Sequence, residues 1–387
     1  MAKYVLVSDP TLMFNYHDFP LLDFLPCAPS SSIPGAIYNF LKGDIAEPLE
    51  DGQARLAPYP VRKLEASLLR CCSPRDVVVP HPDFIEAFIK EDTEVIGVST
   101  MDPLGLGPLT MSYSVLFGSS SYPWVRVEWE ALIGRLNRAR RGTRAKLVVG
   151  GPGVWEFTVF PAELERLGID CAYQGEVEDV ACLLFSQAFE DEFDANIFFR
   201  GFMSFDMNFR SSYRPHERFV SRRPGGKRYP RLEEIPGIVH PAAKALNEVM
   251  RGCGIGCDFC EVTLRPLRYY SFEQIVKEVE VNVRYGGFRN AWLQTDEFFA
   301  YQHGPLYTPN EEALTGLLKA VMDVGGVGST NPTHARISPP AAYPELIRKL
   351  SDIVHAGPSN WIGVQVGVET GSDRLAKLHM PLSAVSK

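Results

Sequence analysis

The sequence predicts an α/β protein of two domains, in which short buried strands alternate with helices. Segments rich in β-branched residues recur through the first half of the chain, and each is followed by a stretch with helical spacing of apolar residues. This rhythm breaks into aromatic, Arg-rich and Pro-rich sequence and then resumes. A chain of 387 residues is also long for one core. We therefore place a first domain at 1–195, a linker at 196–243 and a second domain at 244–387.

The first domain is predicted to be a doubly wound, Rossmann-like parallel sheet. Its candidate strands are 4–7, 95–98, 146–149 and 169–173, and its candidate helices lie near 33–41, 125–140, 161–167 and 178–189. Ligands of such sheets bind beyond the carboxyl ends of the strands. Three of these ends are rich in small and turn residues, which would let a bulky ligand approach the backbone.

The second domain opens with a cysteine motif, C-x3-C-x2-C, formed by Cys253, Cys257 and Cys260. The motif lies between an apolar-ended stretch, 246–251, and a helix-like run, 271–285, so we expect it on a loop that leaves a strand. Three thiolates are one too few for a closed tetrahedral site. A [4Fe-4S] cluster held by three cysteines leaves one iron open to a substrate or cofactor. A zinc knuckle or a redox-inert cluster is the alternative, which the lack of a nearby fourth Cys or His disfavours.

This loop closely resembles the cluster-binding loop of the radical SAM enzymes. The resemblance implies a [4Fe-4S] cluster whose open iron chelates S-adenosylmethionine (SAM), and an electron transfer that cleaves SAM to a 5′-deoxyadenosyl radical. It also implies that the second domain is a (β/α) partial TIM barrel. We count about four strand and helix units from Cys253, whereas the family barrel has six, so we expect the barrel to be incomplete at the C-terminus of this chain.

Later strand ends extend this resemblance. The segment 291–299 contains Asp296 and Glu297, where the family receives the amino group of SAM. Arg336 ends the following strand and resembles the arginine that pairs with the SAM carboxylate. Glu369 and Thr370 lie in the G-x-E-[ST]-G-S phrase of the superfamily and would meet the ribose hydroxyls.

Each of these assignments has a structural alternative. Asp296 could cap the next helical segment. Arg336 could be a salt-bridged surface residue. The turn at Glu369 could bind no ligand, although acidic and hydroxyl groups that end an apolar strand are costly to bury without a partner.

The first domain resembles the cobalamin-binding domain found ahead of many radical SAM domains. The resemblance rests on Val-Ser-Thr at 98–100, Gly-Gly-Pro at 150–152 and Gly-Glu-Val-Glu at 175–178. It implies that the lower face of the corrin lies near the loop 101–106 and that the nucleotide tail follows the strand ends. The candidate contacts are Ser99, Thr100, Met101, Asp102, Gly150, Gly151, Gly175 and Glu176.

Two alternatives remain open for this domain. A nucleotide-binding sheet without a corrin would carry similar strand-end glycines. Met101 and Asp102 could equally be loop-packing and turn residues. The D-x-H-x-x-G loop, by which cobalamin mutases supply a histidine to cobalt, is missing, and His17 does not match it. We therefore expect cobalamin bound without a histidine ligand.

The amino-acid composition limits the possible binding partners of the protein and the cellular compartment in which it works. The net charge of −8 and the pI near 5.6 argue against binding nucleic acid through bulk electrostatics. No apolar run has membrane-spanning length, and the N-terminus turns polar too soon for a secretory signal, so we expect a cytoplasmic protein. The cysteines outside the motif show no framework spacing and are expected to remain thiols: Cys27, Cys71, Cys72, Cys171 and Cys182.

The function implied by both resemblances is a cobalamin-dependent radical SAM methyltransferase that methylates an unactivated carbon. Its cofactors would be a [4Fe-4S] cluster, SAM and cobalamin. Its partners would be an electron donor of flavodoxin or ferredoxin type and a small-molecule, peptide or protein substrate, with a protein or peptide side chain favoured. Basic and aromatic residues within 198–231 could guide an anionic or peptide substrate, although a solvated linker face is favoured.

Three other functions compete with this hypothesis. A cobalamin-linked cyclase or rearrangement enzyme would use the same residues. A methylthiotransferase would need a second cluster from N-terminal cysteines, but Cys71 and Cys72 are an adjacent pair poorly suited to one. A non-catalytic cobalamin or iron–sulfur sensor would form no 5′-deoxyadenosine.

Overall fold

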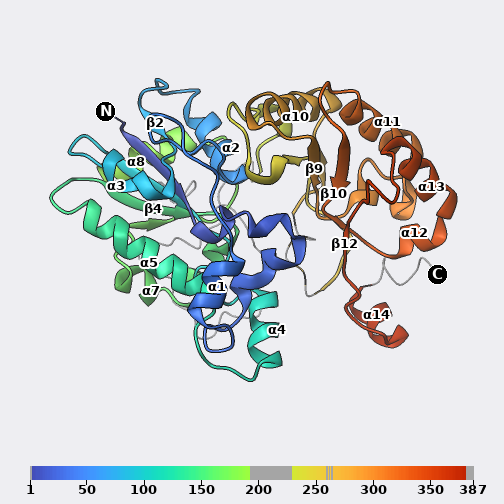
Figure 1. The fold of residues 1–387 in the computed structure, drawn as a ribbon, viewed down its shortest axis with the longest axis horizontal. Coiled ribbons are helices and arrows are strands. Elements are labelled where there is room, and N and C mark those ends of the chain that lie inside the picture. The colour runs from blue at the N-terminus through green and yellow to red at the C-terminus, as the bar shows by residue number, and fades with distance from the viewer. Residues whose placement is uncertain (1, 192–228, 259, 261, 263–264, 381–387) are drawn as a thin grey trace. The chain divides into compact units, whose positions relative to one another are not determined.

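The computed structural model describes residues 2–191, 229–258, 260, 262 and 265–380, and Figure 1 shows their ribbon. The chain divides into two compact units, Met1–Pro230 and Arg231–Lys387. Each unit has its own sheets and its own hydrophobic core.

The expected linker divides between the units in the structure. Residues 231–243 belong to the second unit, where Leu232 and Ile235 lie in its core. The N–H of Ala242 also donates to Asn282 Oδ1 at 2.7 Å. The basic segment of the linker lies almost entirely within 192–228, outside the described residues.

The first unit contains a sheet of five parallel strands in the order β2-β1-β3-β4-β5. The strands are β1 (Tyr4–Ser8), β2 (Val77–Val78), β3 (Val95–Ser99), β4 (Lys146–Gly150) and β5 (Cys171–Ala172). This order confirms the expected doubly wound class. The chain changes direction across the sheet between β1 and β3, which is the switch point where such sheets bind ligands.

Helices cover both faces of this sheet because its strands are apolar on both sides. In β1, Val5 and Val7 enter one core and Tyr4 and Leu6 enter the other. The first core includes residues of α3 (Ile85–Phe88), α5 (Trp124–Ala139), α6 (Trp155–Val159) and α7 (Ala162–Arg166). The second includes residues of α2 (Tyr59–Leu68) and α8 (Ala181–Glu190). Two further helices, α1 (Gly35–Leu41) and α4 (Pro108–Leu116), pack with the 3-10 helix Pro20–Cys27.

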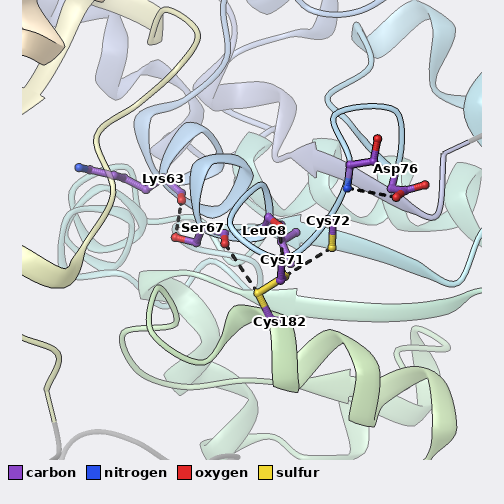
Figure 2. Close-up of a disulfide and its surroundings, with 8 residues drawn as sticks. Lys63, Ser67, Leu68, Cys71, Cys72, Asp76 and Cys182 are labelled. Atoms are coloured by element: carbon purple, nitrogen blue, oxygen red, sulfur yellow. Dashed lines mark hydrogen bonds between the residues drawn. A yellow bond between two sulfur atoms is a disulfide. The ribbon is translucent and has the colours of Figure 1, made fainter.

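One expectation about the cysteines is wrong. Cys71 and Cys182 form a disulfide, and Figure 2 shows it linking the turn after α2 to α8. The packing of α2 against α8 brings together two cysteines that are 111 residues apart in sequence, so their spacing gave no signal. Cys27, Cys72 and Cys171 are free thiols, as expected.

The second unit contains three small sheets. Its strands are β6 (Leu246–Glu248), β7 (Met250–Arg251), β8 (Arg268–Tyr269), β9 (Asn290–Gln294), β10 (Ser329–Pro332), β11 (His334–Ala335) and β12 (Gln365–Val366). One sheet has the parallel order β10-β9-β6, the pair β11-β12 is also parallel, and β7-β8 is antiparallel. Within the described part of this unit the parallel strands thus form two sheets rather than one closed barrel.

The α-helices in the described part of this unit are α10 (Phe272–Gly286), α11 (Glu311–Met322), α12 (Ser338–Ala342), α13 (Pro344–Ile353) and α14 (Asp373–His379). The local sequence explains α10 well. The Ser271 side chain caps its N-terminus by accepting from the Gln274 N–H, and Gly287 ends it in the left-handed conformation at φ 72°. Its apolar face buries Ile275 and Val279 in the core.

None of the helices among the described residues combines the length and the apolar character needed to cross a membrane.

Candidate active site

The cysteine motif lies on a loop that the antiparallel pair β7-β8 closes at its base, where Arg251 pairs with Arg268. Glycines allow the tight path of this loop. Gly252 has φ 78°, and a Cβ there would lie 2.7 Å from the carbonyl oxygen of Arg265. Gly254 has φ 68°, so both positions disfavour any other residue.

The three thiols are free and half-buried. Burial raises the pKa of Cys253 to about 12, and the negative charges of Glu297, Asp296 and Cys260 raise it further. Burial also raises the pKa of Cys257, again with a contribution from Cys260. Three crowded thiolates are therefore costly in this loop by themselves. Cationic iron would remove that cost, so the donor set fits a thiolate-bound cluster.

The geometry of the thiols does not favour a single-ion site. Among the described residues, no group of three or more His, Cys, Asp and Glu side chains lies close enough to hold one metal ion. A zinc knuckle needs its ligands to converge on one ion. In a [4Fe-4S] cluster each thiolate binds a different iron, so its three cysteines need not converge on one point.

Glu297 is a buried residue that orients Arg336. Its side chain is 1% exposed, and its Oε2 accepts from the Arg336 backbone N–H at 2.7 Å and from Arg336 Nε at 3.1 Å. Its Oε1 accepts from the Phe299 N–H at 2.9 Å and so caps the 3-10 helix Phe298–Ala300. Glu297, rather than Asp296, is therefore the cap. With both oxygens engaged, Glu297 can position a ligand-binding residue but is poorly placed to bind SAM itself.

Arg336 presents its outer guanidinium nitrogens away from this ion pair. Its side chain is 14% exposed and uses Nε for Glu297, while Nη1 and Nη2 make no hydrogen bond to the described residues. Its positive charge opposes the rise that burial causes in the pKa of Cys257, which places it near the cysteine loop. The alternative of a surface salt bridge is wrong, because this pair is largely buried. A carboxylate ligand could bind the free edge.

Asp296 offers a second charge beside the loop. Its side chain is exposed, yet protein surrounds it closely enough for burial to raise its pKa, and Arg265 opposes this rise. The Gly252 N–H donates to its carboxylate, and its charge raises the pKa of Cys253. An exposed carboxylate at this strand end suits an ammonium group.

Glu369 lies in a strained turn near the same loop. It has φ 55°, a left-handed conformation that is uncommon for a residue with a side chain. A Cβ on Gly367 would lie 2.4 Å from Glu369 Oε1, so a larger residue there would displace the Glu369 carboxylate. The exposed carboxylate accepts no hydrogen bond from the described residues, and its charge raises the pKa of Cys257. The neighbouring Thr370 Oγ1 accepts from the Ser372 N–H at 3.1 Å.

Two contacts on the cysteine loop escaped the sequence analysis. Tyr307 Oη donates to the carbonyl of Gly254 at 2.6 Å. His379, at the end of α14, contacts Asp258 through Nδ1 at 2.8 Å. Both partners lie far from the loop in sequence and belong to no motif that could have identified them.

In the first unit, the predicted contacts lie at the carboxyl ends of β3 and β4. Ser99 pairs with Gly150 across these strands. Gly151 has φ 102°, and a Cβ there would lie 2.5 Å from the Thr100 carbonyl oxygen, so the backbones approach closely. Thr100 is fully buried, and its hydroxyl donates to Asp9 Oδ2 at 3.4 Å.

Asp9 ends β1 at the switch point and was missed from sequence. It is fully buried, and that burial raises its pKa to about 7, although Thr11 and Thr100 donate hydrogen bonds that oppose the shift. Gly175, after β5, has φ 133°, and the carbonyl of the next residue, Glu176, accepts from Tyr173 Oη at 3.2 Å.

The two loop residues after Thr100 have different surroundings. Met101 is 51% exposed. Asp102 is 7% exposed, and its carboxylate accepts from the Gly107 N–H at 2.8 Å and from Thr110 Oγ1 at 2.5 Å. Asp102 is thus a loop-packing residue, whereas Met101 is open to a ligand.

Comparisons with known proteins bear on both units. Residues 247–384 match the Radical SAM superfamily. This region is a radical SAM domain. Its match includes the three cysteines and every strand end described above for the second unit. A comparison with curated protein sequences finds no match.

Solved structures extend the likeness to the whole chain. The methyltransferase TsrM from Kitasatospora setae, with a tryptophan substrate and a SAM analogue bound, has a TM-score of 0.52 and 16% identity over 100% of this chain and 71% of that one. TsrM with cobalamin and a [4Fe-4S] cluster bound has a TM-score of 0.46 and 17% identity over 95% of this chain and 66% of that one. The apo form of the cobalamin-dependent SAM radical enzyme OxsB has a TM-score of 0.50 and 13% identity over 100% of this chain and 47% of that one.

At these identities the likeness shows the fold alone. The chain has the fold of cobalamin-linked radical SAM enzymes, as the two sequence resemblances predicted. It spans 71% of TsrM at the better match and about half of OxsB.

Proposed function

We propose that this chain is the cobalamin-binding and radical SAM portion of a methyltransferase that acts on an unactivated carbon. The observation that carries the proposal is the arrangement beside the cysteine loop, where buried Glu297 holds Arg336 with its outer guanidinium edge free. Asp296 and Glu369 add exposed carboxylates near the same thiols. These groups match the carboxylate, ammonium and ribose of SAM.

Each group has a distinct role in binding. Cys253, Cys257 and Cys260 would hold the [4Fe-4S] cluster, which supplies the electron that cleaves SAM. Arg336 would bind the SAM carboxylate, since a guanidinium fork binds a carboxylate through two parallel hydrogen bonds. Asp296 would accept from the ammonium group. Glu369 and Thr370 would accept from or donate to the ribose hydroxyls.

Cobalamin would bind at the switch point of the first unit, where its role is to supply the methyl group. Ser99, Gly150, Gly151 and Gly175 offer backbone that a large ligand can approach, and Met101 is exposed beside them. OxsB, whose fold this chain resembles, is a cobalamin-dependent enzyme, which supports this assignment.

No histidine is expected on cobalt. The ring of His17 is already engaged, because its Nε2 lies 2.7 Å from the carbonyl oxygen of Phe40. Cob(II)alamin bound to the protein should show an EPR spectrum without nitrogen superhyperfine splitting. Splitting that disappears in a His17→Ala variant would overturn this part of the proposal.

The substrate class is a small molecule or a peptide. TsrM binds tryptophan, an amino acid, as its substrate, which supports a substrate of that size. A flavodoxin-type or ferredoxin-type donor would supply electrons. A cyclase or rearrangement enzyme remains the second candidate, because it would use the same groups in both units.

Product analysis tests the proposal. With candidate substrates, reductant, cobalamin and SAM, the product should gain one methyl group, with 5′-deoxyadenosine and S-adenosylhomocysteine formed in equal amounts. A product that consumes SAM to 5′-deoxyadenosine without a mass gain would assign the chain to the cyclase or rearrangement class. No consumption of SAM by cluster-loaded protein would leave the sensor function.

A further inference from the structure

The turn that follows α2 brings three sulfur atoms together. Cys71 is bonded to Cys182 of α8, and the free thiol of Cys72 lies 3.4 Å from the Cys71 sulfur. Because Cys71 has no thiol hydrogen in the disulfide, the Cys72 S–H is the donor in this contact. Figure 2 shows the Cys72 sulfur on the side of Cys71 that faces away from Cys182. A thiolate that attacks one sulfur of a disulfide displaces the other, and Cys72 is placed to displace Cys182.

The last turn of α2 offers acceptors for two of these sulfurs when the disulfide is open. The Leu68 carbonyl lies 3.2 Å from Cys71 Sγ, and the Ser67 carbonyl lies 3.8 Å from Cys182 Sγ. Neither disulfide sulfur carries a hydrogen, so these contacts become weak hydrogen bonds only in the thiol state. The two helices also share an apolar core that does not depend on the disulfide. The fold therefore accommodates both the closed and the open state.

The position of Cys182 connects the disulfide to a loop at the carboxyl end of the sheet. Cys182 is the second residue of α8, which begins at Ala181. The loop 173–180 joins β5 to this helix and contains Gly175 and Glu176. The disulfide thus fastens the start of α8, and with it the end of the loop, to the turn after α2.

We propose that Cys72 is the exchange thiol of a redox latch, in which the Cys71–Cys182 disulfide fastens α8 to α2. In the opening step the Cys72 thiolate attacks Cys71 Sγ, so that a Cys71–Cys72 bond forms and the Cys71–Cys182 bond breaks. The electron pair of the broken bond stays on Cys182, which takes up the proton that Cys72 has lost. This step consumes no oxidant and no reductant.

The disulfide that results from this step is easier to reduce than the original one. Neighbouring Cα atoms are about 3.8 Å apart, whereas a disulfide usually spans about 4.4–6.8 Å, so a Cys71–Cys72 bond is strained. Cys71 is exposed, so a dithiol in solution can reach this bond. The dithiol reduces it to two thiols and is itself oxidised to a disulfide. Cys72 therefore gives reductants a second route for opening the latch.

Proximity rather than acidity makes Cys72 the attacking group. Burial raises the pKa of Cys72, as do the charges of Asp76 and Glu94, while Lys3 opposes this rise. Little of the thiol is ionised at neutral pH, and the exchange should speed up as the pH rises toward the pKa. A thiol of this kind leaves the latch closed until a reductant is present.

Two variants test the exchange in the full-length chain. Cys72→Ser removes the attacking sulfur, and Cys27→Ser is the matched control, because Cys27 is also a free, half-buried thiol of the first unit. The disulfide is opened with dithiothreitol, and the newly exposed thiols are alkylated and located by fragment mass spectrometry. Cys72→Ala replaces the serine variant if that variant does not fold.

We expect the disulfide to open about tenfold more slowly in Cys72→Ser than in the wild type and in Cys27→Ser, because direct attack by dithiothreitol on Cys71 is then the only route. In Cys182→Ser, oxidised glutathione should produce a Cys71–Cys72 disulfide. Equal opening rates in the wild type and in Cys72→Ser would make the disulfide a simple structural link. Two free thiols in oxidised Cys182→Ser would also overturn the proposal.

Hydrogen exchange of the wild-type protein tests whether the disulfide acts as a latch. Reduction should speed amide exchange in 174–182 and leave the central strand β3 unchanged. Equal exchange in the oxidised and reduced protein would show that the disulfide fastens nothing. Because Gly175 and Glu176 lie in this loop, reduction would loosen one edge of the proposed cobalamin site. Only this consequence rests on the proposed function, since a chain that binds no cobalamin would show the same exchange rates.

Discussion

The two units each contain a glutamate that is buried almost completely, and the two differ in what they contact. Glu297 in the second unit is 1% exposed and pairs with Arg336. Glu156 in the first unit is fully buried and has no cation as its partner. Its Oε2 accepts from the Leu104 N–H at 2.6 Å, and the carboxylate of Asp102 is the neighbour that further raises its pKa.

The different surroundings of Glu156 and Glu297 give the two carboxyl groups different protonation states. Burial raises the pKa of Glu156 to about 10, and Asp102 adds to this effect, so the group is neutral at pH 7. Its Oε1 has no donor among the described residues, which suits a protonated carboxyl that donates to Asp102. Burial also raises the pKa of Glu297, but the charge of Arg336 and the hydrogen bonds from Arg336 and Phe299 oppose that rise and stabilise the ionised form. One buried carboxyl therefore orients a cation, and the other holds a proton.

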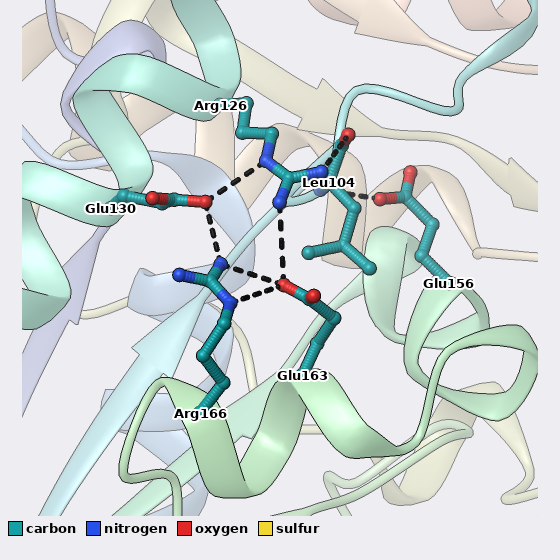
Figure 3. Close-up of polar contacts among 6 residues, drawn as sticks. All are labelled: Leu104, Arg126, Glu130, Glu156, Glu163 and Arg166. Carbon is teal, nitrogen blue, oxygen red and sulfur yellow. Dashed lines mark hydrogen bonds and ion pairs between the residues drawn. The ribbon is translucent and has the colours of Figure 1, made fainter. Parts of the chain in front are cut away.

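The purpose of the neutral carboxyl is to fix a loop. Figure 3 shows Leu104 held from both sides, by Glu156 at its N–H and by Arg126 Nη1 at its carbonyl, the latter at 3.4 Å. Arg126 in turn pairs with Glu130 and Glu163. The loop fixed in this way includes Met101 and Asp102, so Glu156 would shape the proposed lower face of the corrin site.

Removing the charged carboxyl should have the largest effect. Glu297→Ala leaves the Arg336 guanidinium largely buried without its partner and uncaps the 3-10 helix Phe298–Ala300. Breaking a buried pair from one side costs about 3–5 kcal/mol, and we expect a loss of this size in chemical denaturation. Glu297→Gln keeps the shape and should lose less. A loss below about 1 kcal/mol for Glu297→Ala would show that the pair is not a buried anchor.

Removing the oriented cation should weaken ligand binding, and it also leaves the buried Glu297 carboxylate without its partner, so a loss of stability is expected as well. Arg336→Ala deletes a charge-assisted contact worth about 2 kcal/mol or more, so SAM affinity should fall more than tenfold while iron content stays the same. Glu369→Ala should weaken SAM binding in the same direction. Binding is measured by calorimetry on the reconstituted protein. Wild-type affinity in both variants, with only methylation lost, would place these residues in the substrate site.

The neutral carboxyl gives the most distinctive effect, because the effect depends on pH. The folded pKa of Glu156, about 10, lies above the unfolded value, so the unfolded state releases its proton first and stability falls as pH rises between the two values. Glu156→Gln removes this loss and keeps both a donor and an acceptor. We expect the variant to gain stability relative to wild type as pH rises from 5 to 9, by at most about 1.4 kcal/mol per pH unit.

Glu163→Gln is the matched control for this test. Glu163 contacts Arg126 and Arg166 in the same network but is partly exposed and pairs with both cations. Its loss should lower stability modestly, with no gain at alkaline pH. The pH profile of stability is measured by thermal unfolding for both variants. Equal profiles would show that Glu156 holds no proton of its own in the folded protein, and the contrast between Glu156 and Glu297 would fail.

The sequence predicted the parts of this comparison that depend on local patterns. The parallel strands, the doubly wound class and the cysteine loop follow from β-branched segments, strand-end glycines and thiol spacing. The role of Glu297 could not be predicted in the same way, because its partner Arg336 is 39 residues away. Glu156 is 52 residues from Leu104, and Tyr307 is 53 residues from Gly254. Residues that act through such long-range contacts carry no spacing signal.

The most direct test of the account is the cleavage of SAM by the reconstituted wild-type protein under anaerobic reduction without substrate. The account predicts about four irons per chain and measurable 5′-deoxyadenosine, both lost in Cys253→Ala, with 5′-deoxyadenosine alone reduced in Arg336→Ala. Protein that holds its irons, binds SAM and forms no 5′-deoxyadenosine would contradict the assignment of this site to radical SAM chemistry.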